Sequence, residues 1–228
     1  MNATLLLRLA APLQSWGHDS KFERRTTGRE PTKSGVVGMI AAALGRGRNH
    51  DISDLARLKF GVRIDQPGQM LRDFHTAEHT QGKPPYVTQR YYLMDAVFVA
   101  GLEGDAEFLK SVAAALNAPV FPLFLGRRSC PPEGRIVLGL REKCLETALS
   151  EEFWQASEWY KKRAKEWERR LTLVLDSVGA GGAARRRDMP VSFSQEHRKH
   201  SYRYIDDRPG AIIASNITSH DAFRELED

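Results

Sequence analysis

The sequence has few cysteines and no long hydrophobic run. Its 228 residues include only Cys130 and Cys144, whose spacing fits no metal-binding motif, so we expect reduced thiols and no metal or cofactor site. No apolar segment approaches the length that crosses a membrane. The stretch from Leu5 to Leu13 is interrupted by Arg8 and lacks the basic leader and cleavage site of a signal peptide. The sequence therefore predicts a cytoplasmic protein with no membrane partner.

Internal repeats are absent, and acidic residues are outnumbered by basic ones. There are 34 Lys and Arg residues against 29 Asp and Glu, a net charge of +5. A basic surplus favours a polyanionic partner, particularly where the cations gather beside turn glycines or aromatic residues. The basic runs are Arg24-Arg25, Arg46–Arg48, Arg127-Arg128, 161–163, 185–187 and 197–200.

A basic loop precedes a helix that is rich in small residues and predicted at about residues 33–44. Thr32 or Ser34 is suited to cap the free amides at the helix start, where the helix dipole favours an anion. The surrounding cations are Arg24, Arg25 and Lys33. The pattern predicts phosphate binding, although a capped core helix beside a solvated loop explains it equally well. The dipeptide Lys33-Ser34 imitates a Walker A loop, but the glycines of that loop are missing, which argues against an NTPase.

Hydrophobic patterning predicts an α+β domain over residues 1–145. Strands are expected at residues 4–10, 59–65, 94–101 and 135–140, and a second helix should follow Asp105 and end at Asn117. The resulting βαββαβ order is the ferredoxin-like arrangement that RNA-recognition domains also use. Residues 66–93 form a polar insertion too long for a hairpin turn, and such insertions are usually functional.

Residues 146–228 are expected to form a C-terminal helix and β extension packed on this domain. A strongly charged helix is predicted at about residues 147–168. Strands are predicted at residues 171–176 and 201–205, on either side of a flexible Gly/Ala/Arg segment at 179–187.

The inserted segment contains the sequence His75-Thr76-Ala77-Glu78-His79, which matches an H-x-x-E-H zinc motif. That motif requires both histidines on one face of a helix and a third ligand. Because Gly82, Pro84 and Pro85 follow at once, we do not expect a zinc protease. The remaining interpretations are a polar loop, or a loop that contacts nucleic acid through His75, Arg90 and Tyr91.

Two further segments have features of RNA binding. Gly126 allows the backbone to approach a phosphate, and Arg127 and Arg128 supply charge and bidentate hydrogen bonds. After the first strand, Gln14 and Ser15 can bond sugar or phosphate and Trp16 can stack on a base. A tryptophan at a strand end is equally often packed in the core.

These segments together closely resemble the CasD family, whose members hold the 5′ handle of the guide RNA in type I-E CRISPR Cascade complexes. The matching segments are Ala11–Gly17 (APLQSWG), Pro31–Gly38 (PTKSGVVG) and Leu125–Pro131 (LGRRSCP), with further matches at 60–65, 72–76 and 92–98. The resemblance spans about residues 4–140 and is reduced beyond them to scattered positions such as 188–190 and Phe193.

The resemblance implies a modified RNA-recognition fold of the RAMP superfamily, in which residues 66–93 form a β-hairpin thumb. It implies a non-catalytic subunit that caps the backbone filament of Cascade beside the large PAM-reading subunit, so that target DNA is read by the guide RNA. The RNA contacts that the resemblance implies are Gln14, Ser15, Trp16, Arg24, Lys33, Ser34, His75, Arg90, Arg127 and Arg128. Two more are expected from the residues themselves: Arg25 of the basic loop and Tyr91 of the insertion.

Two other functions remain open. A related subtype uses its version of this subunit as a metal-independent endoribonuclease for precursor CRISPR RNA, a reaction that needs a general base, a general acid and a cation at one phosphate. The candidate groups are His18 with Lys21, or His197 and His200 with Lys199 and Tyr202. The third possibility is a structural adaptor whose basic surface only docks acidic subunits.

Overall fold

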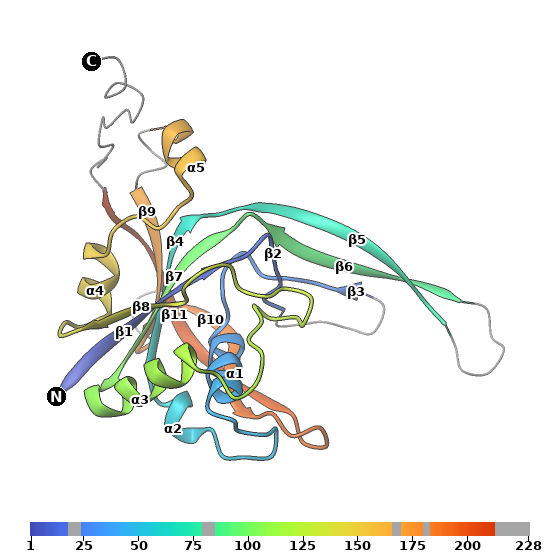
Figure 1. Cartoon of the computed structure of the whole chain (residues 1–228), viewed down its shortest axis with the longest axis horizontal. Helices are drawn as coiled ribbons and strands as arrows, with labels where there is room; N and C mark the ends of the chain where they lie inside the picture. The colour runs from blue at the N-terminus through green and yellow to red at the C-terminus, as the bar shows by residue number, and fades with distance from the viewer. Residues whose placement is uncertain (18–23, 79–84, 166–169, 180–182, 213–228) are drawn as a thin grey trace, which may run out of the picture.

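The first strand, β1 (Asn2–Ala10), divides its side chains between two cores. Leu5, Leu7 and Leu9 are buried in the larger cluster, whereas Leu6 is buried in a second cluster. Because successive side chains of a strand point to opposite faces, the sheet is covered on both sides. The computed structural model describes residues 1–17, 24–78, 85–165, 170–179 and 183–212, over which the chain is mixed α+β and mostly sheet (Figure 1).

The larger sheet has seven strands in the order β10-β11-β9-β4-β7-β1-β8. Every pairing in it is antiparallel. Its remaining strands are β4 (Lys59–Gln66), β7 (Val97–Asp105), β8 (Val137–Arg141), β9 (Arg170–Ser177), β10 (Ala184–Ser192) and β11 (Lys199–Ile212). The strands predicted for residues 1–145 are thus all present. Two begin later than predicted, at Val97 and Val137; the first does so because Asp95, at φ 54°, turns the chain before β7.

Helices α1 (Lys33–Ala43) and α3 (Ala106–Asn117) pack on one face of this sheet, with the short α2 (Ser53–Ala56) beside them. Both predicted caps are confirmed: Thr32 Oγ1 accepts the backbone N–H of Gly35 at 3.2 Å, and the Asp105 carboxylate accepts that of Phe108 at 3.0 Å. Each cap satisfies an amide that the helix itself leaves free.

Helix α4 (Leu145–Glu151) covers the opposite face. It packs over Gly61 and Gly101 of adjacent strands, and a Cβ at Gly101 would lie only 2.6 Å from Leu145 Cδ1. The two glycines therefore allow the helix to approach the sheet closely.

The single long helix predicted at residues 147–168 is wrong in extent. The described part of this segment contains α4 and a separate short helix, α5 (Glu158–Arg163), and residues 166–168 lie outside the described residues. The buried guanidinium of Arg63 donates to the carbonyl oxygens of Leu149 and Glu152 at 2.6 Å, which satisfies acceptors where α4 ends.

The flexible segment predicted at 179–187 is also wrong in part. Its residues 184–187 belong to β10, where pairing with β11 satisfies the backbone; residues 180–182 lie outside the described residues.

A second sheet is built around β6 (Tyr86–Met94). Antiparallel pairing joins β6 to β5 (Gln69–Ala77), and its other edge pairs with β2 (Leu13–Gln14) and β3 (Arg24–Arg25). The polar insertion therefore contains a long β5–β6 hairpin that leaves the main body (Figure 1).

Candidate nucleic-acid interface

Basic and aromatic side chains from distant parts of the chain meet on the body-proximal half of the β5–β6 hairpin. Strand β3 pairs in parallel with β6, so that Arg24 lies opposite Gln89 and Arg25 lies opposite Arg90. The guanidinium carbon of Arg24 is 5.2 Å from the ring centroid of Tyr91. The β5–β6 insertion and the basic loop before α1 thus form one surface.

Arg127 reaches the opposite face of β6 from the loop between α3 and β8, because it packs on Tyr92, whose side chain points away from that of Tyr91. Its guanidinium carbon lies 4.6 Å from the ring centroid of Tyr92, and Nη2 donates to the Arg25 carbonyl oxygen at 2.8 Å. The loop turns at Gly126, whose φ is +87° and where a Cβ would fall 1.6 Å from the carbonyl oxygen of Ser15. Only glycine fits this close approach, which aims Arg127 at β6.

A hollow of about 360 Å³ borders the same side chains. Its lining is Leu13, Leu71, Arg72, Asp73, His75, Arg90, Tyr92 and Ser129. His75 Nε2 lies 2.5 Å from the carboxylate of Asp73, and both side chains are close to half exposed. We call the following residues, which lie around β6 on both of its faces, the basic cluster: Arg24, Arg25, Arg72, His75, Arg90, Tyr91, Tyr92, Arg127 and Arg128.

Two guanidinium nitrogens of the basic cluster lack acceptors. Arg90 Nε and Arg127 Nη1 are buried and have no hydrogen-bond partner within the described ranges. An unsatisfied buried donor costs about 1–3 kcal/mol, and more when it is charged. These two nitrogens are enclosed by protein atoms. The exposed guanidinium groups of Arg24, Arg25 and Arg128 are the ones accessible to phosphate oxygens, which accept bidentate, charge-assisted hydrogen bonds from arginine.

Gln14, Ser15 and Trp16 are buried beneath the basic cluster rather than displayed on it. Trp16 Nε1 donates to Gln14 Oε1 at 3.0 Å, and Gln14 Nε2 donates to the carbonyl oxygen of Ala96 at 2.7 Å. The Trp16 ring lies against Gly35, where a Cβ would be 2.9 Å from it. These contacts join the second sheet to α1, and RNA contact by the three side chains stays a prediction.

Lys33 is buried too, in an ion cluster that closes the start of α1. Its Nζ lies 3.0 Å from an Asp176 carboxylate oxygen, and its backbone N–H donates to Asp188 at 3.0 Å. Arg203 reaches both carboxylates at 2.6 Å. The anion expected at this helix start is therefore an internal carboxylate. Ser34, the next residue, is half-buried, and its contact with RNA also stays a prediction.

Burial lowers the pKa of Lys33, while its ion pair with Asp176 opposes the shift. Burial likewise lowers the pKa of His200, as do the positive charges of Arg198 and Arg187.

The histidines singled out for catalysis have the following placements. His75 lies in the extended strand β5, not in the helix that the zinc motif requires, and His79 is outside the described residues, as are His18 and Lys21. His197 precedes β11, in which Lys199, His200 and Tyr202 lie. Among the described residues, no group of three His, Cys, Asp or Glu side chains is placed to hold a metal ion.

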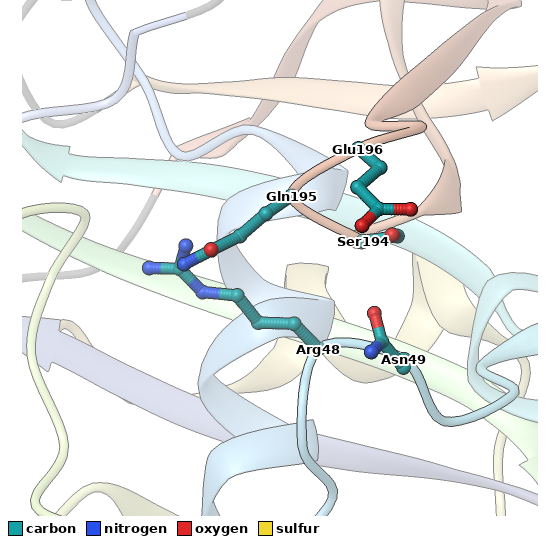
Figure 2. A pocket seen from close by; sticks show the side chains of 5 residues that line it. All are labelled: Arg48, Asn49, Ser194, Gln195 and Glu196. Carbon is teal, nitrogen blue, oxygen red and sulfur yellow. The ribbon is translucent and has the colours of Figure 1, made fainter.

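A larger hollow, of about 490 Å³, lies between the loop after α1 and the β10–β11 turn (Figure 2). Its lining is Arg48, Asn49, Ser194, Gln195 and Glu196. Figure 2 shows Arg48 extending beside Gln195, while Glu196 and Ser194 lie on the same turn as Gln195, across the hollow from Asn49. This lining combines one cation with one anion and does not match the cationic character of the basic cluster. Separately, no helix in the described part of the chain is both long and apolar enough to span a membrane.

Sequence reasoning missed Arg72 and Tyr92 as members of the basic cluster. The signal was present in the register of the hairpin, which places Arg72 opposite Tyr91 and Asp73 opposite Arg90. Predicting that register requires the first residues of β5 and β6, and the sequence of the polar insertion does not indicate them.

Comparison with known proteins gives consistent matches. A family model described as CRISPR-associated protein (Cas_Cas5) matches residues 4–206. The CRISPR system Cascade subunit CasD of Escherichia coli (strain K12) is 35% identical over 161 residues, covering 61% of this chain and 71% of the relative.

Two solved structures are also similar. One, described as a crystal structure of a Cas protein, has a TM-score of 0.72 and 37% identity, covering 92% of this chain and 95% of its own. The other, described as a CRISPR RNA-guided surveillance complex, has a TM-score of 0.72 and 32% identity, covering 91% and 90%.

Proposed function

Because the chain belongs to the Cas5 family of CRISPR-associated proteins and is a Cascade subunit, we propose that it holds the 5′ handle of the guide RNA on the basic cluster. The observation that carries this proposal is that Arg24 and Arg127, from distant parts of the chain, both hold their guanidinium groups over tyrosine rings of β6. A phosphodiester backbone supplies acceptors of the required charge, at repeating intervals.

The basic cluster suits phosphate binding because its cations are oriented. The rings of Tyr91 and Tyr92 lie beneath the guanidinium groups of Arg24 and Arg127. Stacked guanidinium groups lose less side-chain freedom when they bind. Arg128 is exposed beside Arg127 and adds charge at the loop tip. In this scheme the buried Gln14, Ser15 and Trp16 support the surface.

The wider architecture fits this role. We infer that residues 1–145 form a ferredoxin-like RAMP domain, supported by the antiparallel order β8-β1-β7-β4 with α1 and α3 as its connecting helices. The β5–β6 hairpin is then the thumb, and residues 146–228 are an extension packed on the domain. In this assignment the protein is cytoplasmic and non-catalytic, and it binds the Cascade backbone subunits and the large subunit.

The test is RNA binding by the full chain. The double variant Arg90→Ala/Arg127→Ala should bind fluorescein-labelled handle RNA about tenfold more weakly by fluorescence anisotropy. The slope of log affinity against log salt should become shallower by about 0.7 for each lost phosphate contact. Arg48→Ala, an exposed arginine outside the basic cluster, is the matched control and should bind like the native chain. Unchanged affinity and slope in the double variant would contradict the proposal.

Two further measurements separate the alternatives. The native chain, incubated with repeat RNA in the presence of EDTA, should leave the RNA intact; cutting that is lost when His197 and His200 are replaced by Ala would identify a metal-independent endoribonuclease. Assembly into Cascade without any affinity for RNA would instead identify a structural adaptor.

A further inference from the structure

Strand β11 has an exposed face that lies outside the basic cluster. Arg203 and Ile205 are 7% and 2% exposed and point into the molecule, whereas Tyr202 and Tyr204 are 51% and 44% exposed. Because side chains alternate along a strand, the two tyrosines lie on the same, outward face. Two half-exposed aromatic rings on one strand face form a platform rather than a core.

Arg185 of β10 belongs to this platform. It lies directly opposite Tyr204 in the antiparallel register, and its guanidinium carbon is 4.0 Å from the ring centroid of Tyr202. At this distance the cation is in contact with the face of the ring, an attractive cation–π interaction. The outward surface is therefore formed by the Arg185 guanidinium on Tyr202 and by the neighbouring ring of Tyr204.

The platform is firmly supported from beneath. Arg203, between the two tyrosines, is held at 2.6 Å by carboxylate oxygens of both Asp188 and Asp176. The edge of the Tyr204 ring lies against Gly179, where a Cβ would be 2.8 Å from the ring. Binding to this face would therefore require little ordering of the strand or of Tyr204.

This surface is positively charged, and its arginines are not neutralised by ion pairs. Within the described ranges neither Arg185 nor Arg187 forms an ion pair, whereas Arg186 between them pairs with Glu30. Asp206, which strand alternation places on the same face as the tyrosines, is already paired with Arg208. The face thus offers two exposed arginines that pair with no carboxylate in the described part of the chain.

We propose that Arg185, Tyr202 and Tyr204, with Arg187 at the strand edge, form a second nucleic-acid site that binds a single strand independently of its sequence. Aromatic rings and guanidinium planes stack on any base, and the arginines neutralise phosphates. Residues two apart on a strand are about 6.8 Å apart, roughly twice the 3.4 Å spacing of stacked bases. The platform therefore suits an extended, unstacked strand rather than a duplex.

An acidic protein segment is the competing occupant, and it fits less well. A protein partner would gain from the charges, but it would not need a guanidinium group held over one ring beside a second exposed ring. The strand can be RNA or DNA, since stacking and phosphate contacts are common to both.

The experiment uses the full chain and two fluorescein-labelled probes without handle sequence, a dT12 DNA and a U12 RNA. It is performed in the native chain and in the Arg90→Ala/Arg127→Ala variant, so that the basic cluster does not mask the platform. In both protein backgrounds, Tyr204→Ala and Arg185→Glu should each weaken binding of the probes about tenfold, as measured by fluorescence anisotropy. Tyr204→Phe should bind the probes like its parent. Phe153→Ala, an exposed aromatic residue outside the platform, is the control and should change nothing.

Each outcome is decisive. Equal weakening for both probes supports a site for any single strand, and weakening for one probe alone identifies which nucleic acid occupies it. If Tyr204→Ala lowers the melting temperature, its loss of binding can come from unfolding, and the result for Arg185→Glu, at an exposed residue, decides the test. Native affinity in both variants would overturn the proposal, and native affinity combined with failed Cascade assembly would assign the face to an acidic protein partner.

Discussion

Asp188 accepts the backbone N–H of Lys33 at the start of α1 and also pairs with the guanidinium of Arg203. Its side chain is fully buried. Isolated buried charges are costly, so the attraction within this cluster offsets the loss of hydration only while every member is present. The cluster therefore contributes to stability chiefly through the penalty for breaking it.

Asp188→Ala should destabilise the protein by about 3–5 kcal/mol, because it leaves Arg203 with one carboxylate and the α1 start without its anion. Urea unfolding followed by circular dichroism measures the loss. Asp206→Ala, which removes a half-exposed ion pair with Arg208, should change the free energy of unfolding by no more than about 1 kcal/mol. Similar effects for the two variants would contradict this account of the buried cluster.

His200 should make stability depend on pH. Burial lowers its pKa below the ordinary value of 6.5, helped by Arg198 and Arg187 and opposed by Asp188. The unfolded imidazole therefore takes up its proton at a higher pH than the folded one, so the unfolded state binds more protons as the pH falls from 6.5 toward the lowered value. Stability should decrease over this interval.

His200→Gln removes the titrating group and should flatten this part of the pH dependence, as measured by melting temperatures between about pH 7 and pH 5. His50→Gln is the control, since His50 is exposed. A difference between the native chain and His200→Gln that does not vary with pH would disprove the role of this imidazole.

Sequence reasoning found most cations of the basic cluster but could not tell which polar residues are buried. Arg127 and Arg90 are in motifs whose residue types already suggest phosphate binding. By contrast, Lys33 is adjacent to the same basic loop, and only its partners Asp176 and Asp188, far along the chain, show that it points inward. The burial of Trp16 depends in the same way on Gly35 in a helix that packs against it.

At the scale of elements, the β5–β6 hairpin has few buried side chains beyond its base. Along β5 every residue is exposed or half-buried. Replacing residues 75–88 by a two-residue Asn-Gly turn between the facing residues Phe74 and Gln89 should therefore leave the melting temperature within a few degrees of the native value. The same shortening should prevent incorporation into Cascade, which co-purification with the other subunits measures.

The shortened hairpin keeps Arg90 and Arg127, which provides an internal comparison. Handle RNA should still bind it with most of the native affinity. Normal incorporation into Cascade would show that the outer hairpin is not the thumb.

Elements with strong periodicity were predictable, and elements shaped by distant partners were not. The caps Thr32 and Asp105 mark the starts of α1 and α3 in the sequence itself. The charged segment after Glu151 has helical composition, but Arg63 binds the carbonyl groups there and the backbone leaves the helix. A buried arginine on a strand cannot be recognised from a local pattern.

At the scale of the whole molecule, the C-terminal strands are part of the same sheet as the first strands. β9 pairs with β4, and β11 and β10 continue the sheet. Residues 1–145 alone would expose one edge of β4 and leave Lys33 without its carboxylates. We therefore expect a chain truncated after residue 145 to lack the cooperative thermal transition of the full chain. A cooperative transition in the shorter chain would show that the two parts fold independently.

The ion cluster also sets an order of events during synthesis. Lys33 contacts Asp176 and Asp188 across separations of 143 and 155 residues. A ribosome adds about 5–20 residues per second, so Asp176 and Asp188 are synthesised on the order of ten seconds after Lys33. During that interval the backbone N–H and the ammonium group of Lys33 lack the two carboxylates that satisfy them in the finished protein.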